Sequence, residues 1–282
     1  MHYRTLVSTE VVAQHLDDAD WVICDCRHDL LDLAAGRRTY TEAHLPGAHF
    51  LHLDEDLSGR KTGQNGRHPL PIPAELADKL GRLGISQTTQ VVACDAQGGV
   101  YAARLWWLLR WLGHEAVAVL DGGINQWMTE SRPLTSALPQ PKAAVFERLP
   151  GVLPVNATFV LTHLDGDGMQ LIDARAPDRY AGQNETMDPV AGHIPGAINR
   201  FFKLNLDEQG RFKPAQQLRD EFSRLLADTS PGEVVHQCGS GVTACHNLLA
   251  MEHAELEGSR LYPGSWSEWC ADPGRPMARG NG

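Results

Sequence analysis

One cysteine lies in a segment whose composition can support nucleophilic chemistry. The segment Val234–Cys245 reads VVHQCGSGVTAC, so Gly239 and Gly241 closely follow Cys238. The valines favour a buried strand, the glycines allow a tight turn, and helical spacing from Val242 onward predicts a helix after the loop. Main-chain N–H groups in such a loop, with a helix N-terminus behind them, stabilise a thiolate. We therefore predict that Cys238 is a nucleophile, because a buried structural cysteine would not require two nearby glycines.

The elements around this loop alternate between strands and helices. Apolar runs predict strands over Trp21–Asp25, Gln90–Cys94 and Val117–Leu120, and four leucines at helical spacing predict a helix between the last two. The polar stretch after Arg27 is expected to be irregular. Glycine, proline and charged residues over positions 54–73 predict a long surface loop.

The second half of the chain repeats the plan of the first. Four features recur in the same order and at nearly constant spacing: Ile23–Arg27 with Leu171–Arg175, His44–Ala48 with His193–Ala197, Val91-Val92 with Val234-Val235, and Trp127 with Trp269. Strands that alternate with helices imply a parallel sheet flanked by helices. The predicted fold class is therefore α/β, with two similar domains, each a parallel sheet covered by helices.

The length and the prolines indicate where these domains divide. A chain of 282 residues can fill two domains, each with its own core. A proline-containing stretch without clear periodicity separates the two halves, as expected of a linker. We predict a first domain over 1–136, a linker over 137–152 and a second domain over 153–282.

The two halves differ at the position of the nucleophile. Alignment through the paired valines places Asp95 where the second half has Cys238. A carboxylate cannot act as a sulfur nucleophile. The first domain is thus expected to be non-catalytic and the second catalytic.

Charge and cysteine usage limit the partners and the compartment. The formal net charge of −10 argues against nucleic acid and anionic membrane surfaces as partners. The sequence contains no apolar run long enough to cross a bilayer, and the start, MHYRTLVSTE, lacks the apolar segment of a secretion signal, which predicts a cytoplasmic protein. The six cysteines match neither a disulfide framework nor paired zinc-ligand motifs, so no metal is expected.

Taken together, these motifs resemble the tandem-domain rhodanese family of sulfurtransferases over essentially the whole chain. The residues that carry the resemblance are Asp173-Ala174-Arg175, Gly192–Ala197, Cys238–Ala244 and Gly264–Trp269. The resemblance implies that Cys238 accepts a sulfane sulfur from a small donor, holds it as a persulfide and passes it to a thiophilic acceptor. Cyanide and thiols are the implied acceptors, a thioredoxin-like protein among the candidates, and no cofactor is implied. A low-pKa thiolate in a main-chain anion site suits this chemistry.

The loop sequence also bears on the donor. Substrate binding is expected at the residues after the cysteine: Gly239, Ser240, Gly241, Val242 and Thr243. The form Cys-Gly-Ser-Gly-Val-Thr resembles the 3-mercaptopyruvate branch, whereas members that use thiosulfate carry basic side chains here. Because no side chain in this loop is positive, a dianion gains less from it than a carboxylate donor bound partly elsewhere. We favour 3-mercaptopyruvate, with thiosulfate as the alternative.

Arg179 matches the arginine that binds the substrate anion in this family. It follows the strand that ends at Asp173, as Cys238 follows the strand from Val234, so both are expected at the carboxyl edge of a parallel sheet. A guanidinium there can bind a carboxylate with two hydrogen bonds. The alternative is a surface ion pair. The 3-mercaptopyruvate branch usually has a second arginine nine residues further on, where this chain has Asp188.

Three further side chains have predicted roles. Ser240 can donate a hydrogen bond to a developing enolate or thiolate, and His68 loosely matches a histidine of the mercaptopyruvate branch. Because His68 lies in the polar loop, a surface position is favoured over a catalytic one. Arg27 and Arg175 follow Asp25 and Asp173 in both halves, so they are interpreted as structural partners of those acids.

Two other classes of function remain as alternatives. A cysteine phosphatase also places its nucleophile in a ring of N–H groups, but it needs an arginine six residues later, and position 244 is alanine. A non-catalytic module that binds a partner or relays sulfur is the second alternative. The intact cysteine loop favours an enzyme.

Overall fold

The structure is a computed structural model that describes residues 2–164 and 168–280. The chain divides into two compact units. Unit 1 comprises Met1–Gly59, Pro71–Val152 and Glu208–Phe212, and unit 2 comprises Arg60–Leu70, Leu153–Asp207 and Lys213–Gly282. The segment Arg60–Leu70 therefore belongs to unit 2, although it comes from the first half of the sequence.

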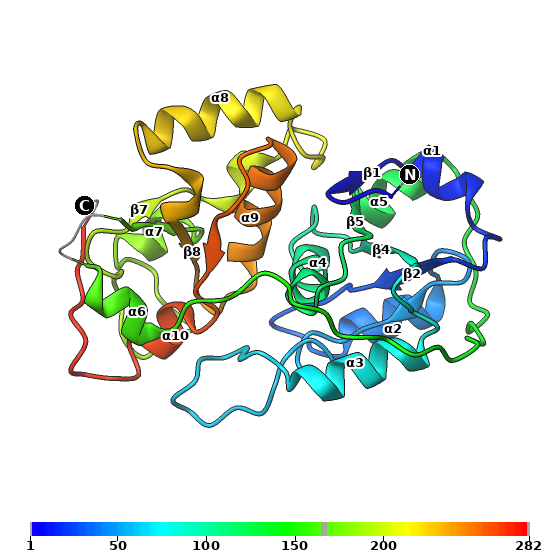
Figure 1. The fold of residues 1–282 in the computed structure, drawn as a ribbon, viewed down its shortest axis with the longest axis horizontal. Helices are drawn as coiled ribbons and strands as arrows, with labels where there is room; N and C mark the ends of the chain where they lie inside the picture. Colours follow the sequence, from blue (N-terminus) through cyan, green and yellow to red (C-terminus); the bar gives the residue numbers. More distant parts are fainter. Residues whose placement is uncertain (1, 165–167, 281–282) are drawn as a thin grey trace. The chain divides into compact units, whose positions relative to one another are not determined.

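Unit 1 is built on a five-stranded parallel sheet (Figure 1). Its strands are β1 (Leu6–Val7), β2 (Trp21–Asp25), β3 (His49–Phe50), β4 (Gln90–Cys94) and β5 (Val117–Leu120), in the order β1-β5-β4-β2-β3. Every residue of β4 and β5 is buried, which explains why both strands appear in the sequence as continuous apolar runs.

The helices of unit 1 connect these strands. They are α1 (Thr9–Gln14), α2 (Ala35–Glu42), α3 (Pro73–Arg82), α4 (Ala102–Trp111) and α5 (Gly123–Thr129). Helix α4 packs against β4 and β5, and eight of its residues, including Trp106 and Trp107, are buried. The side chain of Ser8 caps α1 by accepting a hydrogen bond from the N–H of Val11.

Unit 2 contains a four-stranded parallel sheet of the same design. Its strands are β6 (Gln170–Asp173), β7 (Ile198–Asn199), β8 (Val234–Gln237) and β9 (Arg260–Leu261), in the order β7-β6-β8-β9. This order corresponds strand for strand to β3-β2-β4-β5 of unit 1. The predicted fold, two similar parallel sheets flanked by helices, is confirmed.

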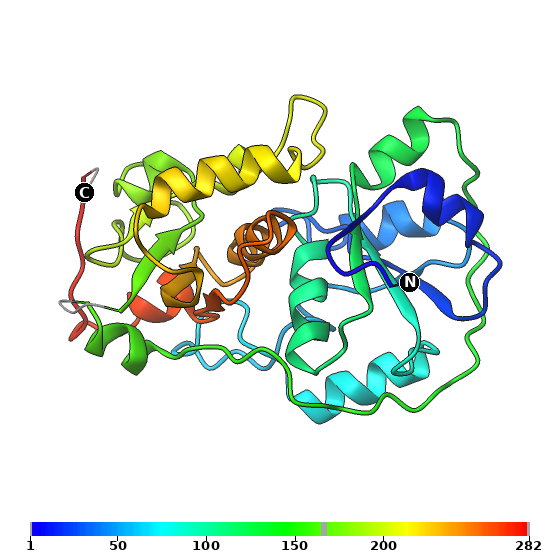
Figure 2. The ribbon, with the colours of Figure 1, turned by 45° about the horizontal axis from the view of Figure 1, so that its top comes forward.

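Helices in unit 2 position the ends of these strands. They are α6 (Ala157–Thr162), α7 (Pro177–Tyr180), η1 (Phe202–Asn205), α8 (Ala215–Leu226), η2 (Pro231–Glu233), α9 (Thr243–His253) and α10 (Ser265–Trp269). Helix α9 packs against β8 and β9, and α8 packs against α9; these are the yellow (α8) and orange (α9) helices of Figure 2. Buried aromatic residues of α10, Trp266 and Trp269, join the core beneath α6 and β6.

Two expectations from the sequence differ from the structure. The stretch after Arg27 contains a helix, α2, which the sequence analysis missed because the residues Ala35–Glu42 carry few apolar side chains. The loop over 54–73 is not uniformly at the surface, since Leu57 and His68 are buried. Within the described ranges, the structure contains no helix that is both long and apolar enough to span a bilayer.

Candidate active site

Cys238 is the first residue after β8, and α9 begins five residues later at Thr243. The N-terminus of α10 fixes the loop between them. The N–H groups of Trp266 and Ser267 donate to the carbonyls of Cys238 and Gly239 at 3.0 and 2.9 Å. The N–H of Cys238 donates to Ser265 Oγ at 3.1 Å. Both the N–H and the carbonyl of Cys238 are thus hydrogen-bonded to residues at the start of α10.

The sulfur of Cys238 is bound by the backbone of its own loop. The residue is 2% exposed, and the N–H of Gly241 donates to its Sγ at 3.2 Å. Gly241 has a φ of 76°, and a Cβ there would lie 2.3 Å from the carbonyl oxygen of Pro263. The turn that aims this N–H at the sulfur therefore requires glycine.

The equivalent loop of unit 1 shows how many main-chain N–H groups this geometry can direct at one side chain. Asp95 directly follows β4, as Cys238 follows β8. Its carboxylate accepts four main-chain hydrogen bonds of 2.8–3.0 Å, from Gln97, Gly99, Tyr101 and Ala102. Burial raises the pKa of Asp95, while these hydrogen bonds oppose the rise. The loop after this strand can therefore direct several N–H groups at one side chain.

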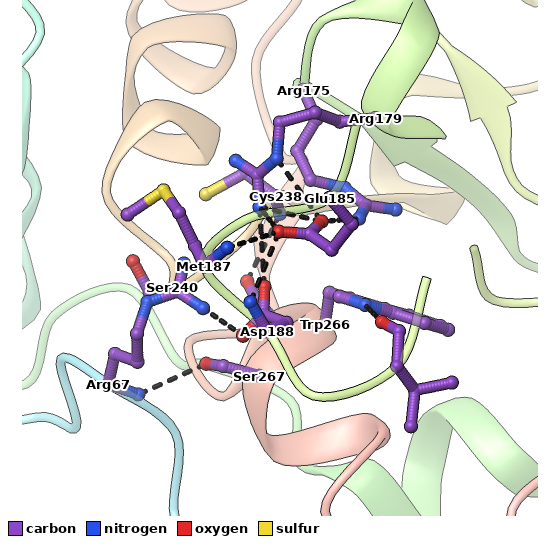
Figure 3. Close-up of polar contacts among 12 residues, drawn as sticks. Arg67, Arg175, Arg179, Glu185, Met187, Asp188, Cys238, Ser240, Trp266 and Ser267 are labelled. Carbon is purple, nitrogen blue, oxygen red and sulfur yellow. Dashed lines mark hydrogen bonds and ion pairs between the residues drawn. The ribbon is translucent and has the colours of Figure 1, made fainter. Parts of the chain in front are cut away.

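Two arginines of unit 2 converge on the cysteine loop (Figure 3). Arg179 projects from α7, and Arg67 comes from the segment Arg60–Leu70. A Cβ built on Gly239 would lie 2.8 Å from Arg67 Nη2 and 3.6 Å from Arg179 Nη1. Both guanidinium groups thus lie against the residue that follows the nucleophile, where they can attract an anion.

Two buried carboxylates bind these arginines. Arg179 Nη2 donates to Glu185 Oε1 and Oε2 at 2.9 Å and lies 3.3 Å from Asp188 Oδ2. Arg67 Nη1 pairs with the other oxygen of Asp188. The side chains of Glu185 and Asp188 are 3% and 2% exposed. Arg179 is therefore both part of an ion-pair network and adjacent to the cysteine loop, and Asp188 belongs to the same cluster.

The pKa values of Glu185 and Asp188 shift in opposite directions. Burial alone would raise the pKa of Glu185, but hydrogen bonds from the Met187 N–H and from Arg179 lower it overall. For Asp188, burial dominates and raises the pKa, although Arg67 and Arg179 oppose the rise. Arg67 and Glu185 were not predicted from the sequence, since a single charged residue in a polar loop has no distinguishing pattern.

His68 lies beside the loop of the nucleophile. It is 5% exposed, and its Nδ1 is 2.7 Å from Ser240 Oγ. The favoured surface position of His68 is therefore wrong. The hydrogen bond gives Ser240, two residues after Cys238, an imidazole partner that can exchange a proton with it.

The family was identified by comparison with known proteins. The model of the rhodanese-like domain matches this sequence twice, over residues 8–130 and 156–272. The chain belongs to the rhodanese family.

Relatives of this rhodanese cover all or nearly all of its length. It is 46% identical over 284 residues to a "Probable 3-mercaptopyruvate sulfurtransferase" of Pseudomonas aeruginosa, with 100% of both chains covered. It is 37% identical to a "Thiosulfate sulfurtransferase" of Rattus norvegicus, with 95% of this chain and 92% of the relative covered. The solved structure of a 3-mercaptopyruvate sulfurtransferase from Leishmania major superimposes with a TM-score of 0.84 and 28% identity, covering 94% of this chain and 74% of that one. The prediction of a rhodanese-type sulfurtransferase is confirmed, and such an enzyme requires a sulfur donor and an acceptor.

A buried ion pair supports the cysteine loop of this rhodanese. Arg175 donates from Nε and Nη2 to Asp173 at 2.7–3.1 Å and from Nη2 to the carbonyl of Gly192, and it stacks on Trp266. Burial alone would lower the pKa of Arg175, but the charges of Asp173, Glu185 and Cys238 raise it. Arg27 and Asp25 form the same pair in unit 1. The structural interpretation of Arg27 and Arg175 is confirmed.

Removal of the Asp173 carboxylate should strongly destabilise unit 2. In Asp173→Ala, the guanidinium of Arg175 stays buried without its main partner, which costs about 3–5 kcal/mol. Asp25→Ala provides the matched change in unit 1, because Asp25, like Asp173, is fully buried. Urea unfolding, followed by tryptophan fluorescence, measures both variants. A loss below about 1 kcal/mol in either would show that the pair does not support its sheet.

One side-chain cluster has the composition of a metal site. Among residues 2–164 and 168–280, the ligand atoms of His28, His52 and Asp54 lie within 4.8 Å of one another. However, both ring nitrogens of His52 already bind main-chain groups. Nε2 lies 2.9 Å from the carbonyl of Leu33, and Nδ1 accepts the N–H of Asp54 at 3.1 Å. A metal ion would have to break these bonds, so the cluster does not fit a preformed site.

Proposed function

We propose that this rhodanese transfers a sulfane sulfur from 3-mercaptopyruvate to a thiophilic acceptor through a persulfide on Cys238. The observation that carries the proposal is the position of the thiol. It lies at the carboxyl edge of a parallel sheet, accepts a hydrogen bond from Gly241, and has two guanidinium groups beside the next residue. This arrangement binds an anionic donor next to a sulfur nucleophile.

The first step forms a sulfur–sulfur bond. The thiolate of Cys238 attacks the sulfur of 3-mercaptopyruvate, the carbon–sulfur bond breaks, and the pyruvate enolate leaves with the bonding electrons. The proton lost from the donor's thiol is delivered to the enolate carbon, which gives pyruvate and a persulfide anion. In the second step, cyanide or a thiolate attacks the outer sulfur, and the Cys238 thiolate is released.

The main chain of Gly239, Ser240, Gly241, Val242 and Thr243 surrounds the outer sulfur in this proposal. In unit 1, the equivalent loop supplies four N–H groups to one carboxylate. We infer that a persulfide, one atom longer than the thiol, receives comparable support from its own loop. Apart from Arg67 and His68, whose segment Arg60–Leu70 belongs to unit 2, the first domain, 1–136, then has a supporting role, and the linker 137–152 connects it to the catalytic domain, 153–282.

The donor's carboxylate is assigned to Arg179, with Arg67 as a second cation. Both lie beside Gly239 and are partly exposed, whereas their acid partners are buried. Thiosulfate is the alternative donor, because it too is an anion with a transferable sulfur.

Ser240 and His68 are suited to move the proton in the first step. Ser240 Oγ can donate to the enolate while His68 replaces its proton through the 2.7 Å hydrogen bond. Sulfite leaves thiosulfate without needing a proton. Ser240 and His68 are therefore expected to accelerate transfer from 3-mercaptopyruvate but not from thiosulfate.

Ser240→Ala should consequently separate the donors. We expect kcat with 3-mercaptopyruvate to fall by roughly a hundredfold, the size of a general acid contribution, while kcat with thiosulfate changes little. Steady-state formation of thiocyanate, with cyanide as acceptor, measures both. Ser223→Ala, an exposed serine on α8, is the control. Equal losses with the two donors would contradict the proton-transfer role.

We also propose a thiol as the physiological acceptor and a reducing compartment as the location. A thiol acceptor, such as a thioredoxin-like protein, fits the persulfide chemistry. The six cysteines are all free, which supports a reducing compartment such as the cytoplasm.

The decisive experiment tests turnover directly. The protein is incubated with 3-mercaptopyruvate or thiosulfate in the presence of cyanide, and thiocyanate is measured. Mass spectrometry without an acceptor should show the addition of one sulfur atom. If neither donor gives thiocyanate while a partner protein accepts sulfur, the relay module is the better description.

A further inference from the structure

We propose that Asp188 is a charge filter that selects monoanionic sulfur donors over dianionic ones. The inference rests on the proposed function and assigns its donor specificity to one residue. It starts from the position of the carboxylate, which is almost completely buried and binds Arg67 with one oxygen and Arg179 with the other.

The side-chain charges of the cluster around Asp188 sum to zero. Arg67 and Arg179 contribute two positive charges, and Glu185 and Asp188 contribute two negative ones. Arg175 is likewise balanced by Asp173. In the proposed mechanism, an approaching donor therefore meets paired guanidinium groups and the reacting thiolate of Cys238.

A donor's own charge then decides how easily it reaches the sulfur. 3-Mercaptopyruvate carries one negative charge, on its carboxylate, whereas thiosulfate carries two. Repulsion from the thiolate is larger for the dianion, and a neutral cluster offers it no net positive charge in return. Without the charge of Asp188 the cluster would have a net charge of +1, which favours the dianion more than the monoanion.

The carboxylate is held in place as a fixed part of the site. Its side chain is 2% exposed, whereas that of Arg67 is 25% exposed and that of Arg179 is 21% exposed. The acid binds one guanidinium group with each oxygen, and other nitrogens of the same two groups lie against the loop at Gly239 (Figure 3). A donor can therefore contact the arginines while Asp188 continues to neutralise them from the buried side.

Replacement of Asp188 by asparagine tests the filter. Asp188→Asn keeps the shape of the side chain and removes its charge. We expect the ratio of kcat/KM for thiosulfate to that for 3-mercaptopyruvate to rise about tenfold, the order expected for one unit charge in a partly solvated site. Asp188→Glu keeps the charge and should leave the ratio within about threefold of wild type.

A matched control separates a local from a global effect of charge. Asp220→Asn removes one negative charge from the exposed surface of α8 in the same unit and should leave the ratio unchanged. The filter is wrong if Asp188→Asn leaves the ratio unchanged or lowers it, or if Asp220→Asn or Asp188→Glu raises it equally. Melting curves confirm that each variant is folded.

The wild-type protein provides a second measurement that needs no variant. Burial raises the pKa of Asp188, so it gains a proton at a higher pH than an ordinary aspartate. The charged or titratable groups that face it are Arg67, Arg179, Glu185 and Cys270. The donor ratio should rise towards thiosulfate as the pH falls into the acidic range, and a constant ratio would contradict the filter.

Failure of the filter is distinguishable from failure of the proposed function. If Cys238 does not carry the sulfur, no persulfide forms on it with either donor. If only the filter is wrong, the persulfide forms and the donor ratio does not respond to Asp188.

Discussion

Replacement of Cys238 by serine is expected to abolish sulfur transfer from both donors, by about a thousandfold or more, with the fold retained. A serine hydroxyl can still accept the hydrogen bond that the N–H of Gly241 makes to the sulfur at 3.2 Å, so the loop should keep its shape. It cannot form a persulfide. Thiocyanate formation gives the rate, and the mass of the protein after incubation with donor shows whether sulfur has been added.

The nearest thiol on α9 provides the control for this result. Cys245 is buried, and its Sγ donates to the carbonyl of Gly241 at 3.3 Å, a bond that a serine hydroxyl can also make. Cys245→Ser should still form the persulfide. If Cys238→Ser gained a sulfur atom, or if Cys245→Ser lost this ability, the sulfur carrier would have to be reassigned.

Local patterns in the sequence were sufficient to predict the strands and the tight turn that position Cys238. The strands β2, β4 and β5 have the predicted bounds, because buried parallel strands leave continuous apolar runs between turn residues. The glycines after Cys238 indicated a tight turn, and Gly241 does adopt a left-handed conformation. The repeat indicated two similar sheets, and both sheets share the order of four strands.

Partners that are distant in sequence could not be predicted in this way. Arg67 contacts Asp188 across 121 positions, and His68 contacts Ser240 across 172. Neither contact leaves a periodic signal, since each depends on where a polar loop lies in the folded unit. Arg179 and Asp188 had both been named from the sequence, Arg179 as a predicted donor-binding residue and Asp188 as a departure from the family pattern. That they share a buried cluster with Glu185 and Arg67 required the structure.

Replacement of Gly241 by alanine is expected to damage both the fold and the activity. The residue has a φ of 76°, which costs an alanine about 1–2 kcal/mol, and the added Cβ would lie 2.3 Å from the carbonyl of Pro263. The backbone must shift to relieve this contact, and the N–H that binds the sulfur shifts with it. We expect a loss of about 2 kcal/mol or more in unfolding free energy and roughly a hundredfold loss in kcat/KM, since small displacements of reacting groups are costly.

The same substitution two residues earlier should have a different effect. Gly239 does not have a left-handed backbone, and a Cβ there would meet chiefly the guanidinium ends of Arg67 and Arg179, which can move. Gly239→Ala should therefore change stability by less than about 1 kcal/mol while it raises the KM for the donor, because the displaced arginines bind the donor less well. Urea unfolding and steady-state kinetics distinguish the two variants. If both lose equal stability, the close contact of Gly241 with Pro263 does not define the loop, and if Gly239→Ala leaves the donor's KM unchanged, the two arginines do not bind the donor.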